Sequence, residues 1–321
     1  MNKENIIIIG NPIAGGNALK KIRLALDIFK KKGFRVELLL TEKRGDAEGF
    51  ARKIARQPST LVVAAGGDGT YNEVANGLVK SGTPMAILPV GTTSVLAKEL
   101  KIPSRIPAAV DFIINGIEQA VHPGKLTLTD GSHPLPYERY FLLMAGIGFD
   151  GEAVFGVNKN IKKHLGKGGY ILSGLDVFRK YNPQPITLNA YDAEVIKKCG
   201  SKDIHSNHQQ HSYLSLSGYI AIIGKAACYG GDFKITRHAR LTDPFFYVFI
   251  AHGRSRCSLL KYIAGIAVQV HLRYKDISYL KTAKLDVLGD SKVQIDGDYA
   301  GTTPVSVEVV PDALKLIVKN H

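Results

Sequence analysis

Three short apolar runs in the first third of the chain each end in a glycine-rich loop that opens a helical pattern. The runs cover residues 6–9, 61–65 and 85–90. Unbroken apolar runs that alternate with amphipathic helices are typical of a parallel sheet buried on both faces. The spacing therefore predicts a doubly wound α/β domain. Helices are expected over residues 18–32, 46–56 and 71–79, and a further strand over residues 34–40.

The three loops share a composition that suits phosphate binding. In an open α/β sheet, ligands bind beyond the carboxyl ends of the strands. Glycines let backbone N–H groups approach an anion, and each helix start adds a positive dipole end. Three such loops side by side would surround a di- or triphosphate. They are residues 11–16 (NPIAGG), 66–70 (GGDGT) and 91–94 (GTTS).

The middle loop is the most informative of the three. Asp68 would repel a phosphate, so its carboxylate is expected to orient a metal-bound water or a sugar hydroxyl. Thr70 and Glu73 have the spacing of a capping box, which predicts a helix that begins at the end of the loop. For this loop alone, a tight strand–helix turn with an Asp turn former is the alternative.

Beyond residue 120 the pattern changes to short strands separated by turn signals. A series of short strands with few helices is typical of a sandwich or an open barrel, and a length of 321 residues fits two domains. We expect an α/β domain over residues 1–120 and a β-rich, sandwich-like domain over residues 121–321. Its strands are expected at 122–129, 139–145, 186–190, 213–223, 245–251, 284–288, 292–295 and 305–309, and its helices at 151–162, 170–179 and 258–270.

The charge balance restricts the classes of partner. The chain has 42 Lys and Arg against 28 Asp and Glu, a formal net charge of +14, which attracts nucleic acid, an anionic membrane or phosphorylated ligands. Tryptophan is absent and no helix-turn-helix, RNP or zinc-finger pattern is present, which argues against nucleic acid. Lysines cluster in residues 158–170, and arginines add smaller clusters, although a solvated face is the alternative. These residues are Lys159, Lys162, Lys163, Lys167, Arg254 and Arg256.

Cysteine content and hydropathy indicate the compartment. The three cysteines form no C-x-x-C pair, so neither a disulfide framework nor a zinc site fits, and a reducing, intracellular location is expected. The most lipid-like stretch, residues 213–224, is much shorter than the roughly 20 apolar residues of a spanning helix. We therefore expect no transmembrane segment, and contact with a membrane only from its surface.

Together these motifs resemble the diacylglycerol kinase-like lipid kinases, the family that includes bacterial diacylglycerol kinases, YegS-type lipid kinases and sphingosine kinases. GGDGT alone is shared with NAD kinases and relatives of phosphofructokinase, so the combination carries the likeness. The matching stretches are 11–15 (NPIAG), 41–47 (TEKRGDA), 66–73 (GGDGTYNE), 88–92 (LPVGT), 146–150 (GIGFD) and 296–298 (DGD).

The resemblance implies an architecture and an activity. Enzymes of this family have an α/β nucleotide domain and a β-sandwich domain, with the active site in the cleft between them. They transfer the γ-phosphoryl group of ATP, with Mg²⁺, to the hydroxyl of diacylglycerol or a related lipid alcohol. Such an enzyme would be cytoplasmic, peripherally associated with an anionic membrane surface, and without a nucleic-acid partner; a homodimer is compatible with the resemblance.

Carried over position by position, the resemblance also implies residue roles. Asp298 would accept the proton of the lipid hydroxyl, with Asp296 beside it and Asp150 near the transferred phosphate. A hairpin turn between residues 293–295 and 305–309 is the alternative for the whole segment 296–298, Asp298 included. A helix cap is the alternative for Asp150. The nucleotide would contact Asn11, Pro12, Ile13, Ala14, Gly15, Thr41, Gly66, Gly67, Asp68, Gly69, Thr70, Tyr71, Asn72, Gly91 and Thr92.

A loop of the second domain is similar to the family's structural metal site. There a Mg²⁺ ion would be held by the Asp243 carboxylate and by backbone carbonyls, with Arg240 and Phe245 completing the site. An Asp-Pro turn is the alternative for this segment.

Three positions depart from the family pattern. Ser94 and Val95 stand where the family has Asn, often followed by Asp, and Asp298 replaces a Glu that is one methylene longer. Small displacements of a reacting group can cost much of the rate. Two alternatives therefore stay open: a kinase of a soluble acceptor, similar to NAD kinases, and a non-catalytic member that keeps nucleotide or membrane binding.

Overall fold

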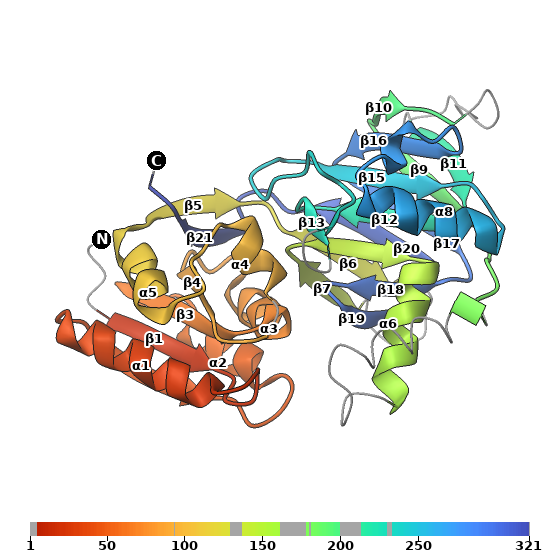
Figure 1. Ribbon diagram of the computed structural model, residues 1–321. Coiled ribbons are helices and arrows are strands. Elements are labelled where there is room, and N and C mark those ends of the chain that lie inside the picture. Colours follow the sequence, from red (N-terminus) through yellow and green to blue (C-terminus); the bar gives the residue numbers. More distant parts are fainter. Residues whose placement is uncertain are drawn as a thin grey trace. The chain divides into compact units, whose positions relative to one another are not determined.

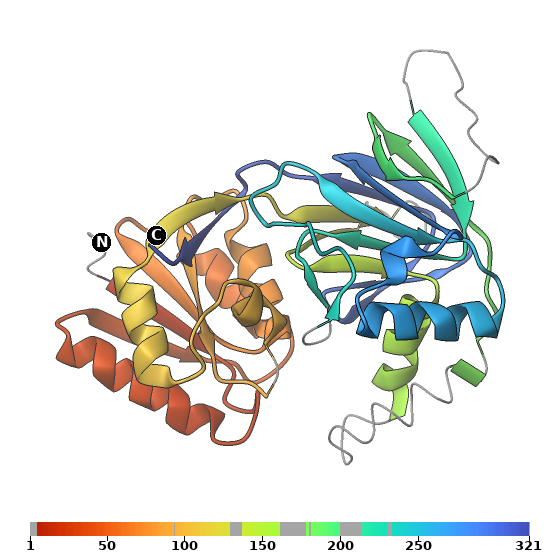
Figure 2. The same ribbon diagram turned by 45° about the horizontal axis from the view of Figure 1, so that its top comes forward.

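The computed structural model describes residues 5–92, 94–128, 137–160, 178–179, 181–199, 213–229 and 233–320 (Figures 1 and 2). The chain divides into two compact units. The first unit comprises Met1–Pro123 and Val310–His321, and the second comprises Gly124–Val309. Most of the basic segment 158–170 and of the helix expected at 170–179 lies outside the described residues, as do the side chains of its four lysines.

The sheet of the first unit has the strand order β2-β1-β3-β4-β21-β5 among the described strands. The first four strands are parallel to one another, which confirms the predicted doubly wound α/β fold. Its strands are β1 (Asn5–Gly10), β2 (Arg35–Leu40), β3 (Thr60–Gly66), β4 (Pro84–Pro89), β5 (Ile117–Val121) and β21 (Leu314–Val318).

Helices cover both faces of this sheet (Figure 1). The helix α1 packs beside α5, and α2 packs beside α3. The inward side chains of α1, Ile22, Ala25 and Phe29, recur at helical spacing and are fully buried. The helices are α1 (Ala18–Lys31), α2 (Asp46–Ile54), α3 (Asp68–Leu78), α4 (Val95–Glu99) and α5 (Ile106–Asn115).

The C-terminal segment returns to the first unit. We expected residues 121–321 to form one domain, but β21 pairs in parallel with β4 and antiparallel with β5. An apolar strand at the end of the chain thus finds an open sheet edge far away in sequence, a pairing that no local pattern encodes.

The second unit is a β-sandwich. Its two sheets have the orders β10-β16-β15-β12-β8-β18-β19 and β11-β9-β17-β20-β6-β7 among the described strands, and side chains from both sheets share one hydrophobic core. Burial alternates along strands such as β6 and β9, as expected for sheets with one inward face. This confirms the predicted sandwich-like domain.

Eight strand ranges and two helix ranges expected from the sequence correspond to described elements of the second unit, but 139–145 and 213–223 each overlap two strands, and β10, β13, β14, β16 and β19 were not expected. No described helix of the chain is both long enough and apolar enough to cross a bilayer. The elements are β6 (Gly124–Leu128), β7 (Glu138–Phe141), β8 (Met144–Ile147), α6 (Phe149–Asn160), β9 (Ile186–Tyr191), β10 (Glu194–Lys197), β11 (Tyr213–Gly218), β12 (Ile220–Gly224), β13 (Cys228–Tyr229), β14 (Phe233–Lys234), β15 (Phe246–Ala251), α8 (Arg256–Ala267), η1 (His271–Arg273), β16 (Ile277–Thr282), β17 (Lys284–Gly289), β18 (Lys292–Ile295), β19 (Asp298–Thr302) and β20 (Val305–Val309).

Candidate functional site

The first unit has a topological switch point at β1. The chain passes from β1 to β2 on one side and then crosses back to β3 on the other side of β1. The loops that follow β1 and β3 lie at the carboxyl edge of the sheet, where ligands of such sheets bind. The NPIAGG motif forms the loop after β1, whereas GGDGT spans the last residue of β3, the connecting Gly67 and the first turn of α3.

Hydrogen bonds join the three glycine-rich loops into one cluster. The Asn11 N–H donates to the carbonyl of Ala65 at 2.9 Å, which ties the first loop to the end of β3. The Gly91 N–H donates to the carbonyl of Gly66 at 3.0 Å, which ties the third loop to the second. The structure thus brings together the three loops that the sequence singles out.

The outer surface of this loop cluster is open to solvent. Ile13 is 84% exposed, and Gly16, Gly69 and Thr92 are also exposed. A Cβ atom on Gly15 would lie 3.1 Å from the amide nitrogen of Thr92, so glycine permits the close approach of the first and third loops. Asn11, Pro12, Ala14, Thr41 and Gly67 are partly exposed, whereas Gly66, Thr70 and Asn72 are buried.

Asp68 holds the third loop. Its Oδ2 accepts from the Val95 N–H at 2.9 Å, and its Oδ1 accepts from the Leu96 N–H at 3.0 Å. Burial raises the pKa of this carboxyl group, and the two backbone donors counteract the rise. We expected Asp68 to orient a metal-bound water or a sugar hydroxyl. That contact stays a prediction; in the structure both oxygens cap the first turn of α4, a role that needs a partner 27 residues away.

Tyr71 lies inside the first unit rather than at its surface. Its side chain is fully buried, and its hydroxyl donates to the Gly66 carbonyl at 2.8 Å. Ser94 Oγ donates to the Tyr71 hydroxyl at 3.1 Å, so the serine that departs from the family pattern has an internal partner. Burial raises the pKa of Tyr71, which keeps the hydroxyl neutral. The Tyr71 side chain is therefore part of the support of the loops.

The predicted capping box is wrong. The helix α3 begins at Asp68 with Gly67 as its N-cap, so Thr70 lies within its first turn. Glu73 Oε1 instead accepts from the Gly45 N–H at 3.0 Å, and Asp46 Oδ2 accepts from two N–H groups of the same loop. Sequence reasoning missed this role of Asp46 and Glu73, although both lie in the matching stretches. Together they position the loop that follows Thr41.

In the second unit, Asp296 and Gly297 form a two-residue hairpin turn. Both have positive φ angles, 48° and 87°, as a type I′ turn requires. The hairpin alternative for this dipeptide is thus correct, but the turn joins β18 to β19 rather than to residues 305–309. The Asp296 carboxylate points away from the hairpin and accepts hydrogen bonds from three backbone N–H groups. These come from Leu142 at 2.8 Å, Leu143 at 2.8 Å and Met144 at 3.0 Å.

A glutamine links Asp150 to this turn. Gln294 Nε2 donates to Asp150 Oδ2, and Gln294 Oε1 accepts from the Gly297 N–H at 2.8 Å. Asp298 is the first residue of β19, opposite Ile295, and is partly exposed. The structure therefore gathers the three aspartates that the resemblance places at the catalytic site around β8 and β18. Sequence reasoning did not identify Gln294.

Asp150 is a buried group. It is 6% exposed and lies in the first turn of α6, so the structure does not support a cap of a helix that begins after it. The Tyr229 hydroxyl donates to its Oδ1, beside the bond from Gln294. Burial raises the pKa of Asp150, and the two donors counteract the rise. A Cβ atom on Gly146 would lie 1.7 Å from Asp150 Oδ2, which explains the glycine at that position of the GIGFD motif.

The loop expected to bind a structural metal contains a buried lysine. Lys225 Nζ donates to the Asp243 carbonyl and, at 3.3 Å, to the Phe245 carbonyl, and its side chain is fully buried. Burial lowers the pKa of Lys225 to about 8. The Arg240 N–H donates to Asp243 Oδ2 at 3.1 Å. A divalent cation at these carbonyls would lie against an ammonium group, so this donor set does not fit the expected Mg²⁺.

Comparisons with known proteins agree with both halves of the chain. Residues 5–126 match the diacylglycerol kinase catalytic domain, and residues 144–318 match the YegS C-terminal NAD kinase beta sandwich-like domain. A diacylglycerol kinase of Bacillus subtilis (strain 168) is 27% identical over 304 residues, which cover 92% of this chain and 90% of that protein. A diacylglycerol kinase of Staphylococcus saprophyticus is 27% identical over 302 residues, with the same coverage of 92% and 90%.

A solved structure has the same fold. The crystal structure of a diacylglycerol kinase from Bacillus anthracis str. Sterne superposes with a TM-score of 0.70 at 23% identity. The match covers 99% of this chain and 97% of that one. The α/β unit and the sandwich unit thus occur together, in this order, in another protein.

Proposed function

The chain belongs to the diacylglycerol kinase family of lipid kinases, and we propose that it transfers the γ-phosphoryl group of ATP to the hydroxyl of diacylglycerol or a related lipid alcohol. The acceptor would be presented at an anionic membrane surface, because the chain has a formal net charge of +14. Mg²⁺ would arrive with ATP and neutralise charge on the phosphates during transfer.

The observation that carries this proposal is the loop cluster at the carboxyl edge of the first sheet. Phosphoryl transfer depends mainly on positioning and on electrostatic stabilisation of the phosphates. Backbone N–H groups of glycine-rich loops at helix starts supply both without a charged side chain. In the proposal, loop residues 13–16 and 92, together with Gly69 in the first turn of α3, surround the phosphates of ATP; all of them are exposed or partly exposed. Asp68 and Tyr71 support the loops through hydrogen bonds to the Val95 N–H and the Gly66 carbonyl, respectively.

Asp298 is the proposed proton acceptor. A single group that takes the proton of the attacking hydroxyl completes a phosphoryl-transfer site. Asp296 would act as a positioning residue, because its carboxylate anchors the turn just before Asp298. Asp150 would act in the same way through Gln294, which bonds the N–H of Gly297. In the proposal, these bonds fix the turn and so hold the Asp298 carboxylate at one position.

The experiment is a transfer assay with a matched pair of variants. Purified protein is incubated with radiolabelled ATP and Mg²⁺ in mixed micelles that contain diacylglycerol, monoacylglycerol, sphingosine, ceramide or phosphatidylglycerol, with NAD in a lipid-free sample. We expect label on one lipid, loss of transfer in Asp298→Asn, and no loss in Asp290→Asn, an exposed aspartate of the same unit.

Two outcomes would contradict the proposal. Label on NAD alone would assign a soluble acceptor. Bound ATP without transfer to any acceptor would assign a non-catalytic role. Nucleotide binding is therefore measured in parallel by calorimetry, and Asp298→Asn should retain it because the proposed phosphate contacts are made by the glycine-rich loops.

A further inference from the structure

The helix α8 of the second unit has an apolar face directed to solvent. Leu260 is 53% exposed and Ile263 is 46% exposed, and Val268, directly after the helix, is 66% exposed. Ala264 and Ala267 are exposed at the same helical spacing. We call these five side chains the α8 patch. A contiguous exposed apolar surface of this kind marks an interaction site more often than a solvated face.

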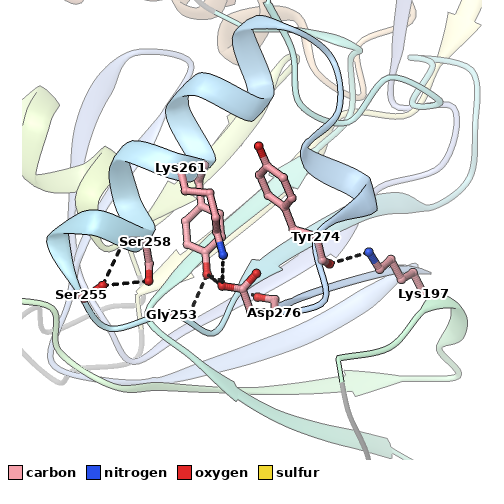
Figure 3. A network of polar contacts seen from close by, with 8 residues as sticks. Lys197, Gly253, Ser255, Ser258, Lys261, Tyr274 and Asp276 are labelled. Carbon is pink, nitrogen blue, oxygen red and sulfur yellow. Dashed lines mark hydrogen bonds and ion pairs between the residues drawn. The ribbon is translucent and has the colours of Figure 1, made fainter.

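A polar network fixes which face of α8 points outward (Figure 3). The Tyr262 hydroxyl donates to Asp276 Oδ2 at 2.6 Å and accepts from the Gly253 N–H at 2.9 Å. Lys261 Nζ forms an ion pair with the same Asp276 oxygen at 2.5 Å. Ser255 caps the helix by accepting from the Ser258 N–H at 3.0 Å. Because these bonds anchor the inner face, the α8 patch cannot turn inward without breaking them.

Basic side chains frame the α8 patch. Arg254, Arg256, Arg273 and Lys275 are exposed, and none of them forms an ion pair within the described part of the chain. From residue 245 to residue 284, Asp276 is the only acid in the sequence. Its carboxylate is occupied by Lys261 and Tyr262. The chain segment that carries the patch is therefore predominantly basic.

We propose that the α8 patch docks on the anionic face of a lipid bilayer. Apolar side chains at the acyl boundary and cations at the headgroups are the two components of interfacial helix binding. An uncharged protein groove would match the apolar residues but leave four cations without a partner. The proposal rests on the proposed function only in that a lipid acceptor places the protein at a membrane.

The test is vesicle binding without nucleotide, so that it is independent of phosphoryl transfer. Vesicles of phosphatidylcholine with about one third phosphatidylglycerol are floated with the full chain at low and moderate salt. Each Arg or Lys near such a surface contributes about 1 kcal/mol, which is about fivefold in partitioning. We expect about a 25-fold loss in Arg254→Gln/Arg256→Gln, and a loss of at least tenfold in Leu260→Ser/Ile263→Ser.

Matched controls lie on α1, which also has exposed apolar and basic side chains. Leu24 is 46% exposed, and Lys30 and Lys31 are exposed in its last turn. Leu24→Ser and Lys30→Gln/Lys31→Gln should bind vesicles like the unmodified chain. Equal losses in the α1 and α8 variants would overturn the proposal. Unchanged vesicle binding by the α8 variants would also overturn it. If these variants in addition change from dimer to monomer, the patch would be assigned to contact with a second copy of the chain.

A second inference concerns the loop around Asp243. Lys225 follows β12 directly, and its fully buried ammonium group donates to the carbonyls of Asp243 and Phe245. The family resemblance places a structural cation among these same groups. We infer that the Lys225 ammonium is the cation of this loop and that the loop folds without a divalent metal. The two carbonyl groups supply the acceptors that the buried ammonium group needs.

The test compares thermal unfolding in EDTA with unfolding in millimolar Mg²⁺ or Ca²⁺, without nucleotide. For the unmodified chain we expect the same midpoint in each buffer. The Lys225→Ala variant should unfold at a lower temperature, and divalent ions or methylammonium should restore part of the loss because they can enter the vacated position. A metal-induced rise in the unmodified chain that Asp243→Asn abolishes would overturn the inference.

Discussion

Replacement of Asp296 separates a structural role of this residue from a catalytic one. Its carboxylate accepts three backbone N–H groups of residues that are nearly fully buried, so its removal leaves three donors without this acceptor. A hydrogen bond to a charged group contributes about 1.5 kcal/mol at the low end. Three such bonds amount to about 4 kcal/mol in Asp296→Ala, and an alanine at a φ of 48° adds about 1 kcal/mol.

Asp296→Asn should cost less. Its Oδ1 can still accept from Leu143 and Met144, whereas the amide nitrogen would face the Leu142 N–H. Asparagine also tolerates the left-handed conformation. We therefore expect about 2 kcal/mol for this variant.

The assay is thermal unfolding followed by circular dichroism, with transfer activity measured at a temperature where each variant is folded. At about 2 to 4 °C per kcal/mol for a unit of this size, Asp296→Ala should lower the midpoint by about 10 to 20 °C. The control is Asp192→Ala, because Asp192 also has a positive φ of 46° in a strand-to-strand turn and is exposed. An Asp296→Ala midpoint within the shift of this control would refute the reasoning, as would full stability with lost transfer.

Three further perturbations test other parts of the site. In Gly66→Ala, the new Cβ atom would lie 2.3 Å from Thr70 Oγ1, so stability should fall by about 1 to 3 kcal/mol and ATP affinity should fall with it in calorimetry. The control is Gly49→Ala in α2, where a Cβ atom meets open space outside the loop cluster. Ser94→Ala removes the donor to the Tyr71 hydroxyl and should cost about 1 kcal/mol in urea unfolding without loss of ATP binding; a large loss of binding would instead place Ser94 at the nucleotide. Burial raises the pKa of Asp150, so the native state binds this proton more tightly than the unfolded chain does. The free energy of unfolding therefore falls as pH rises from about 4, near the pKa of an unfolded Asp, through the native pKa of Asp150. Asp150→Asn should therefore gain stability relative to the unmodified chain over that pH range in urea titrations, and a pH-independent difference would contradict this.

The loops illustrate what local sequence can predict. Glycines, apolar runs and helix starts act within a few residues of one another, because they set backbone freedom and the period of burial. The doubly wound first unit, the sandwich-like second unit and the glycine-rich loops could thus be expected without coordinates. The motif order added the family, and with it the positions of Asp150, Asp296 and Asp298.

The capping box shows where local reasoning failed. Thr70 and Glu73 have the required spacing, but Glu73 bonds the N–H of Gly45, on another loop. Likewise, the return of β21 to the first sheet follows from an open strand edge. Both are contacts between segments far apart in the chain.

The sequence by itself determined the classes of the two units, most of their strands and helices, and the glycine-rich loops, because these depend on short-range conformational preferences. Only the tertiary structure decided what each buried charge contacts. Asp68 caps α4 from 27 residues away, Asp296 binds backbone groups more than 150 residues earlier, and Lys225 bonds the carbonyls of a later loop. A buried charge must be paired, but the partner is the group that the topology places within reach, and that information is spread over the whole chain.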